Sequence, residues 1–172
     1  MRNVVCTVCI LIFLGITPVY ALDHINIYVP NAEKVGQGRL SYMLWDVYDV
    51  VLYAPGGDWQ FDEPFALQLS YLRDIPGKKI ADRSVEEIRA QGFTDEVRLA
   101  DWHAQMSSFF PNVHEGVTLT GVYTNAGETI FYEDDRKIGH VKDPEFSRQF
   151  FNIWLSPQTS APDLRRKLLG QS

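Results

Sequence analysis

The sequence predicts an α+β protein in which a layer of helices covers one face of a large antiparallel sheet. The 172 residues are 45% hydrophobic and 13% aromatic, which is typical of a globular domain with a sheet-rich core. Segments of strand character come first, two helical segments follow, strands return, and two further helical segments end the chain. This order lacks the regular strand–helix alternation of a parallel α/β fold, so the antiparallel class is favoured.

The first 21 residues indicate a secretory signal peptide. Arg2 supplies a positive start, and the apolar stretch 4–16 is shorter than the roughly 20 residues that cross a bilayer. Val19 and Ala21 then place small residues at a cleavage site. We predict cleavage after Ala21, a mature chain 22–172 that forms one domain without a membrane span, and a periplasmic or secreted location. An uncleaved N-terminal anchor is the alternative.

Both cysteines of the chain, Cys6 and Cys9, lie in this leading segment. In a folded domain their C-x-x-C spacing would indicate redox chemistry or a zinc site. Within a signal peptide the pair is discarded, so we expect a mature protein that folds without disulfides.

The first strands are predicted between residues 24 and 73. The segment 24–30 alternates enough for a short edge strand that ends at a proline. The apolar and aromatic run 39–54 is either one long bent strand or two strands with a tight corner near Asp46. The segment 65–73 alternates between two faces and is a further strand.

The second half of the chain combines helices and short strands. A helix is predicted over 79–91, with a start as late as Ser84, where S-x-x-E fits a capping box. Thr94 is a plausible N-cap for the next helix, and Asp143 followed by proline is another helix start. The remaining elements are strands over 117–123, 129–133 and 137–141 and a last helix over 160–169.

Charge and motifs exclude several kinds of function. The net charge of −6 gives no gain from counterion release on a phosphate backbone, so nucleic acid is not expected as a partner. Gly36-Gln37-Gly38 lacks the third glycine of a dinucleotide fingerprint and leads into a strand. The four histidines have no ligand-like spacing. We therefore expect no cofactor and no metal.

Arg39 is the charged residue that most needs an explanation. It enters an apolar run with no acid beside it, and an unpaired buried charge is costly. Its partner is either Asp46 or Asp49 across the strand, or the carboxylate of a ligand held by the planar guanidinium. Tyr48 lies in the same run and could donate a hydrogen bond to that ligand.

A series of short motifs extends over residues 35 to 170. It includes Gly36-x-Gly38-Arg39-Leu40-Ser41, Asp46-Val47-Tyr48-Asp49, Tyr71-Leu72-Arg73-Asp74-Ile75, Phe110-Pro111-Asn112-Val113, Asp143-Pro144-Glu145-Phe146 and Ile153-Trp154-Leu155-Ser156-Pro157. In order and spacing these motifs resemble the bacterial exported branch of the chalcone isomerase-like family. The resemblance implies an open-faced sandwich, in which a large antiparallel sheet carries helices on one face and a ligand cleft lies between them.

The resemblance also implies candidate site residues. Arg39 matches the family's sheet arginine, and Tyr48 stands where plant enzymes have a threonine and non-enzymatic relatives often have a tyrosine. Plastid relatives hold a fatty-acid carboxylate with such a pair. The catalytic tyrosine of the plant enzymes corresponds here to Ile80, and a helix asparagine corresponds to Glu87. An isoleucine cannot hydrogen-bond a ketone, so catalysis as in the plant enzymes is not expected.

Three functions follow as alternatives. The first is a periplasmic, non-catalytic protein that binds a fatty acid or similar apolar carboxylate through Arg39 and Tyr48. The second is a cofactor-independent intramolecular lyase or isomerase acting on an enone-like substrate. The third is an interaction module without a ligand, in which Arg39 pairs with Asp46 or Asp49 and the cleft is filled by the protein's own side chains.

Overall fold

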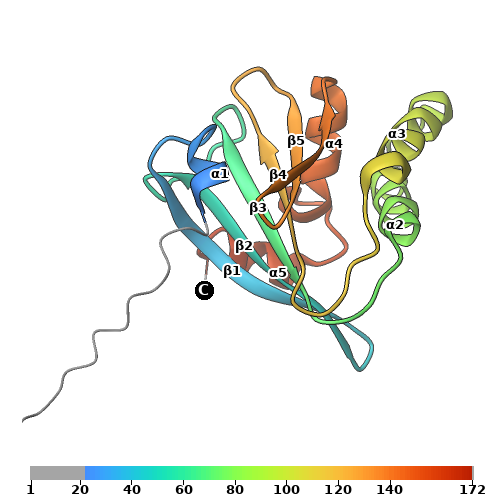
Figure 1. Cartoon of the computed structure of the whole chain (residues 1–172), viewed down its shortest axis with the longest axis horizontal. Helices are drawn as coiled ribbons and strands as arrows, with labels where there is room; N and C mark the ends of the chain where they lie inside the picture. Colours follow the sequence, from blue (N-terminus) through green and yellow to red (C-terminus); the bar gives the residue numbers. More distant parts are fainter. Residues whose placement is uncertain (1–21, 172) are drawn as a thin grey trace, which may run out of the picture.

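The computed structural model describes residues 22–171, and a six-stranded antiparallel sheet lies at its centre (Figure 1). The strands lie in the sheet in chain order, each paired with the next. They are β1 (Ala32–Tyr42), β2 (Trp45–Pro55), β3 (Phe65–Tyr71), β4 (Thr118–Tyr123), β5 (Thr129–Glu133) and β6 (Arg136–Val141). The predicted signal peptide, with Cys6 and Cys9, lies outside the described residues.

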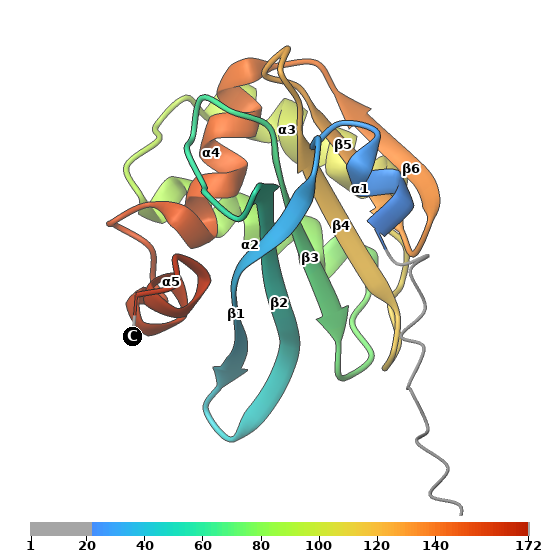
Figure 2. The ribbon, with the colours of Figure 1, turned by 90° about the vertical axis from the view of Figure 1, so that its left-hand side faces the viewer.

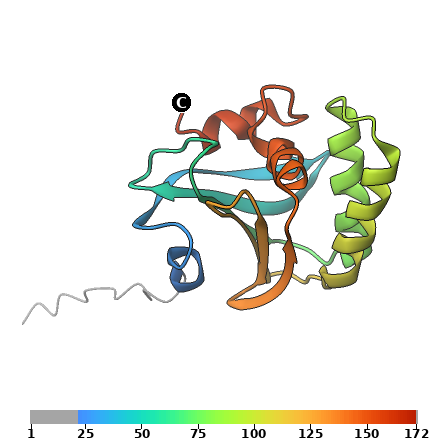
Figure 3. The same cartoon turned by 90° about the horizontal axis from the view of Figure 1, so that it is seen from above.

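Four helices share a hydrophobic core with one face of the sheet (Figure 3). They are α2 (Gly77–Ala90), α3 (Glu96–Phe109), α4 (Pro144–Leu155) and α5 (Pro162–Leu168). The large side chains Phe65, Trp102, Phe146 and Phe151 are almost fully buried in this core. The arrangement confirms the predicted α+β class and the open-faced sandwich.

The opposite face of the sheet is partly covered by the short helix α1 (Asp23–Asn26). The prediction of an edge strand over 24–30 was wrong. Ile25 and Val29 stand four residues apart, which places both on one face of a helical turn, where they pack against Val122 and Ile130.

The apolar run 39–54 forms two strands with a tight corner, one of the two predicted options. The corner is the turn Met43-Leu44, and Tyr42 and Trp45 pair across it. The hairpin of β1 and β2 projects beyond the other strands (Figure 2). Its register decides which residues face the helices.

Two helix starts differ from their predictions. The helix α2 begins at Gly77, and the Ser84 hydroxyl donates to the Ile80 carbonyl inside the helix, so Ser84 is not a cap. The N-cap of α3 is Asp95 instead of Thr94, since its carboxylate accepts from the Val97 and Arg98 backbone N–H groups. An ionised side chain is favoured there because it also faces the positive end of the helix dipole.

The N-cap of α4 is Asp143, as predicted, and it also links two helices. Its carboxylate accepts from the Glu145 backbone N–H at 3.0 Å, from Arg98 at 2.8 Å and from the Trp102 indole at 2.9 Å. Burial raises the pKa of Asp143, but the hydrogen bonds from Arg98 and Trp102 outweigh it and hold that pKa below its usual value.

Gly36 and Gly38 allow α5 to lie directly on β1. A Cβ atom added to Gly36 would stand 2.1 Å from the Lys167 carbonyl oxygen, and one added to Gly38 would stand 2.6 Å from Leu164 Cδ1. The Gly-x-Gly pattern therefore serves close packing of the last helix on the first strand.

Candidate functional site

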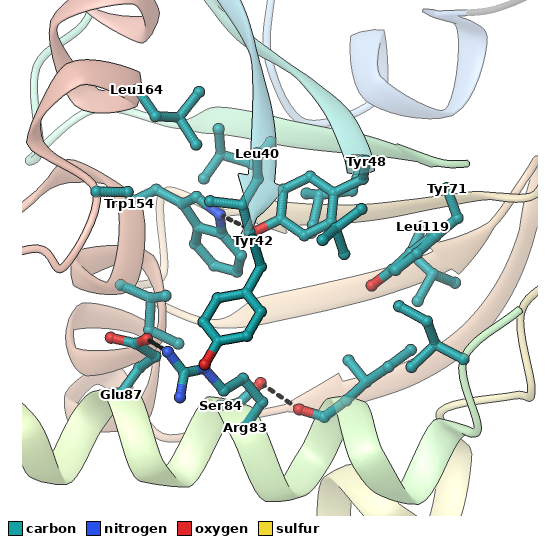
Figure 4. Close-up of a pocket in the computed structure, with 18 of the residues that line it drawn as sticks. Leu40, Tyr42, Tyr48, Tyr71, Arg83, Ser84, Glu87, Leu119, Trp154 and Leu164 are labelled. Carbon is teal, nitrogen blue, oxygen red and sulfur yellow. Dashed lines mark hydrogen bonds and ion pairs between the residues drawn. The ribbon is translucent and has the colours of Figure 1, made fainter. Parts of the chain in front are cut away.

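A cavity of about 860 Å³ lies between the sheet and the helices. Strands β1 to β5, the helices α2 and α4, and the start of α5 with the segment before it line the cavity (Figure 4). Its lining is mainly aliphatic and aromatic, and includes Leu40, Leu67, Leu69, Leu119, Phe131 and Phe150. Both the volume and the lining match sites that take up small apolar molecules.

Tyr48 belongs to the cavity wall and is held there by α4. Its hydroxyl oxygen accepts a hydrogen bond from the Trp154 indole N–H at 2.9 Å, and both side chains are buried. Burial raises the pKa of Tyr48, so the phenol remains protonated. Because the oxygen accepts from Trp154, the phenol proton can be donated to a ligand.

Tyr71 adds a second phenol on the neighbouring strand. It pairs in register with Tyr48, and the two rings meet edge to face with their centroids 5.7 Å apart. Its side chain points into the cavity (Figure 4). Burial raises the pKa of Tyr71 as well. The cavity thus contains two neutral hydrogen-bond donors among apolar side chains.

Charged residues of α2 border the cavity where it meets solvent. Lys79 and Arg83 stand four residues apart on one face of α2, and their side chains are 72% and 62% exposed. Arg83 is paired with Glu87, whose largely buried carboxylate also accepts from the Ser160 hydroxyl at 3.0 Å. Cations beside an apolar cavity can hold an acidic head group at the surface while an attached chain is buried.

Arg39 is at the rim of the cavity, but its side chain does not share a face of the sheet with Tyr48. Arg39 is in register with Asp49, whereas the next pair is Leu40 with Tyr48. Successive residues of a strand point to opposite faces, so the guanidinium lies on the face away from the helices. The two predicted binding residues therefore border one cavity, but their side chains lie on opposite faces of the sheet.

The guanidinium of Arg39 is already held by two carboxylates. It donates to both oxygens of Asp49, at 2.7 and 2.9 Å, and to Asp46 at 2.8 Å. The hydrogen bonds to Asp49 and then Asp46 raise the pKa of Arg39. The Ser41 hydroxyl and Arg39 together lower the pKa of Asp46. Of the two partners predicted for Arg39, the structure shows the acids across the strand, Asp46 and Asp49.

Comparison with known families matches residues 35–170 to chalcone isomerase-like proteins. The chain belongs to the chalcone isomerase-like family. Among curated proteins it is similar to an uncharacterized protein of Haemophilus influenzae, with 26% identity over 141 residues that make up 81% of this chain and 69% of the relative.

The fold of this family also appears in a solved structure that resembles the chain. A fatty-acid binding protein of Arabidopsis thaliana superposes with a TM-score of 0.66 and 12% sequence identity. The match covers 81% of this chain and 87% of the plant protein. At that identity the likeness establishes the shared fold.

In this chalcone isomerase-like chain, Ile80, which the resemblance was expected to match to the catalytic tyrosine of the plant enzymes, lines the cavity. An aliphatic side chain can neither transfer a proton nor orient a water molecule. Glu87, which the resemblance was expected to match to a helix asparagine, is engaged by Arg83 and Ser160.

Sequence reasoning missed three side chains of the site. Arg83 and Lys79 lie on a helix whose alternating charges are typical of a solvated face. Tyr71 stands in a strand whose alternation places it on the face with Leu67 and Leu69, which was a usable signal. That pattern gives the face but does not show that the face borders a cavity.

Within residues 22–171, no helix is long and apolar enough to cross a membrane. Over the same residues, no cluster of histidine, cysteine and acidic side chains could hold a metal ion.

Proposed function

We propose that this protein binds a fatty acid or similar apolar carboxylate in the cavity, without catalysis, in the periplasm. The observation that carries the proposal is the large apolar cavity, which Lys79 and Arg83 border at its exposed side. The hydrocarbon chain lies among the leucines and phenylalanines, where each buried methylene contributes about 0.8 kcal/mol.

The polar contacts are assigned from the side chains that face the cavity. Lys79 and Arg83 attract the carboxylate at the exposed side, and the Tyr48 hydroxyl is available to donate a hydrogen bond to a ligand that carries a second polar group along its chain. Arg39 takes no part, because its guanidinium lies on the face of the sheet away from the helices, where it is paired with Asp46 and Asp49. The periplasmic location is supported by the predicted signal peptide at residues 1–21.

The first experiment measures affinity for saturated fatty acids of increasing length, by calorimetry on protein purified from an exporting bacterial host. The Kd should fall roughly fourfold for each added methylene until the cavity is filled, and then level off. Leu119→Trp, which enlarges a cavity wall residue, should move that plateau to a shorter chain. A Kd that does not depend on chain length would contradict the proposal.

The head-group assignment has a matched pair of variants. Exposed ion pairs are worth about 0.2–1 kcal/mol, so Arg83→Gln should weaken fatty-acid binding by about 1.4-fold to fivefold. Arg39→Gln removes a guanidinium from the other face and should leave the Kd unchanged. If Arg39→Gln weakens binding and Arg83→Gln does not, the head group lies elsewhere.

The isomerase alternative draws support from the Tyr48 and Tyr71 phenols, which could donate to the carbonyl oxygen of an enone. Loss of chalcone absorbance in the presence of the pure protein, slowed in Tyr71→Phe, would favour that alternative over non-catalytic binding.

A further inference from the structure

The end of the β1–β2 hairpin exposes four consecutive large apolar residues, Tyr42, Met43, Leu44 and Trp45, called the hairpin tip below. Their exposed fractions are 66%, 84%, 95% and 64%. Single apolar residues are common on protein surfaces, but an uninterrupted exposed run is unusual unless it has a function. The hairpin tip projects away from the body of the protein (Figures 1 and 2).

The backbone of the hairpin tip also departs from what stability alone favours. Met43 has a φ of 55°, in the left-handed region that suits glycine. The other described non-glycine residues with positive φ are Asn31 and Asp134, and both residue types tolerate that region. A two-residue hairpin turn of this kind is most stable with a glycine at the first position. The tip therefore has a large apolar side chain, that of Met43, at a position where the backbone conformation favours glycine. This is expected where the side chain makes a functional contact.

The composition and shape of the hairpin tip fit a lipid surface. Two aliphatic side chains at the apex are flanked by a tyrosine and a tryptophan, the residues that favour the membrane–water interface. The Arg73 guanidinium lies over the Trp45 ring, 5.3 Å from its centroid, and forms no ion pair with any acid of residues 22–171. A cation at that level is placed to meet lipid phosphates.

We propose that the hairpin tip docks this protein on the surface of a lipid bilayer. Met43 and Leu44 enter the boundary of the acyl chains, while Tyr42, Trp45 and Arg73 remain among the head groups. Tyr42 also lines the cavity and points from β1 toward α2 (Figure 4). When the tip rests on a bilayer, the part of the cavity that Tyr42 lines therefore lies close to the lipid surface. Exchange of a fatty acid between the cavity and that surface rests on the proposed function, whereas docking does not.

Vesicle binding tests the proposal on protein purified from an exporting host, with its N-terminus determined by mass spectrometry. The vesicles are phosphatidylcholine, alone or mixed with phosphatidylglycerol, and some have brominated acyl chains. Trp45 is the most exposed tryptophan, so its emission should be quenched by the brominated chains. The double variant Met43→Gly with Leu44→Ser relieves the turn strain and removes two apolar side chains. It should keep the fold and bind vesicles at least about tenfold more weakly.

Val97→Ser is the matched control, since Val97 is 81% exposed on α3, away from the tip. It should bind vesicles as the unchanged protein does. Docking would be refuted by binding that is absent on both vesicle types, or that falls equally in the double variant and the control. If the unchanged protein and Val97→Ser are dimers in solution and the double variant is a monomer, the tip is instead a self-association surface. The fatty-acid Kd of the double variant, measured without vesicles, tests the cavity separately.

Discussion

The hydrogen bond between Tyr48 and Trp154 joins the sheet to α4 across the cavity wall, and its removal gives a defined loss of stability. Tyr48→Phe keeps the ring and removes the acceptor of the buried Trp154 indole N–H. A buried donor left without a partner costs about 1–3 kcal/mol. The free energy of unfolding should fall by that amount, and each kcal/mol should lower Tm by about 2–4 °C.

Tyr71→Phe is the control for this prediction, because Tyr71 is equally buried beside Tyr48 but its hydroxyl faces the cavity. Its unfolding free energy should change by less than about 1 kcal/mol. Urea unfolding followed by circular dichroism measures both variants, and a double-mutant cycle with Trp154→Phe isolates the pair. Coupling of about 0.5–3 kcal/mol is expected. Equal losses in the two tyrosine variants, or zero coupling, would refute the reasoning.

Three further predictions concern stability. Gly36→Ala places a methyl group against the Lys167 carbonyl and should lower the unfolding free energy by about 1–3 kcal/mol, measured by urea unfolding, with the fatty-acid Kd raised as α5 shifts. Asp143→Ala removes the α4 cap and the partner of Trp102, and should lower Tm by an amount that corresponds to about 2–3 kcal/mol. Burial lowers the pKa of His24 from 6.5, so the unfolded chain binds the proton first and stability should fall as pH drops below 6.5. A His24→Gln variant, compared in urea at several pH values, should lack that part of the loss.

Much of the fold could be predicted because its signals are local. The strand 129–133 has the predicted bounds, and Asp143 caps α4 as expected, since alternation and capping depend on neighbouring residues. The corner at Met43-Leu44 had no glycine or asparagine to mark it. The short helix α1 could not be told from a strand, because a few apolar residues fit either period.

The site was harder to predict because it depends on register and on distant segments. Whether Arg39 and Tyr48 share a face is decided by the pairing across the hairpin, and a shift of one residue reverses the answer. Arg83 and Leu164 meet the same cavity from helices far apart in the chain. No local sequence pattern indicates that these two residues are close in space. The cavity and the cations beside it therefore could not be predicted from the sequence.

The packing of α5 on β1 has a consequence for the order of events during folding. The first strand and the last helix complete one wall of the cavity together, through contacts between residues more than 120 positions apart. Contacts of such high sequence separation form late, because a long loop must close first. The wall that β1 and α5 share is therefore completed only when α5 is in place. Under the proposed function, a ligand loads only after α5 has packed on β1.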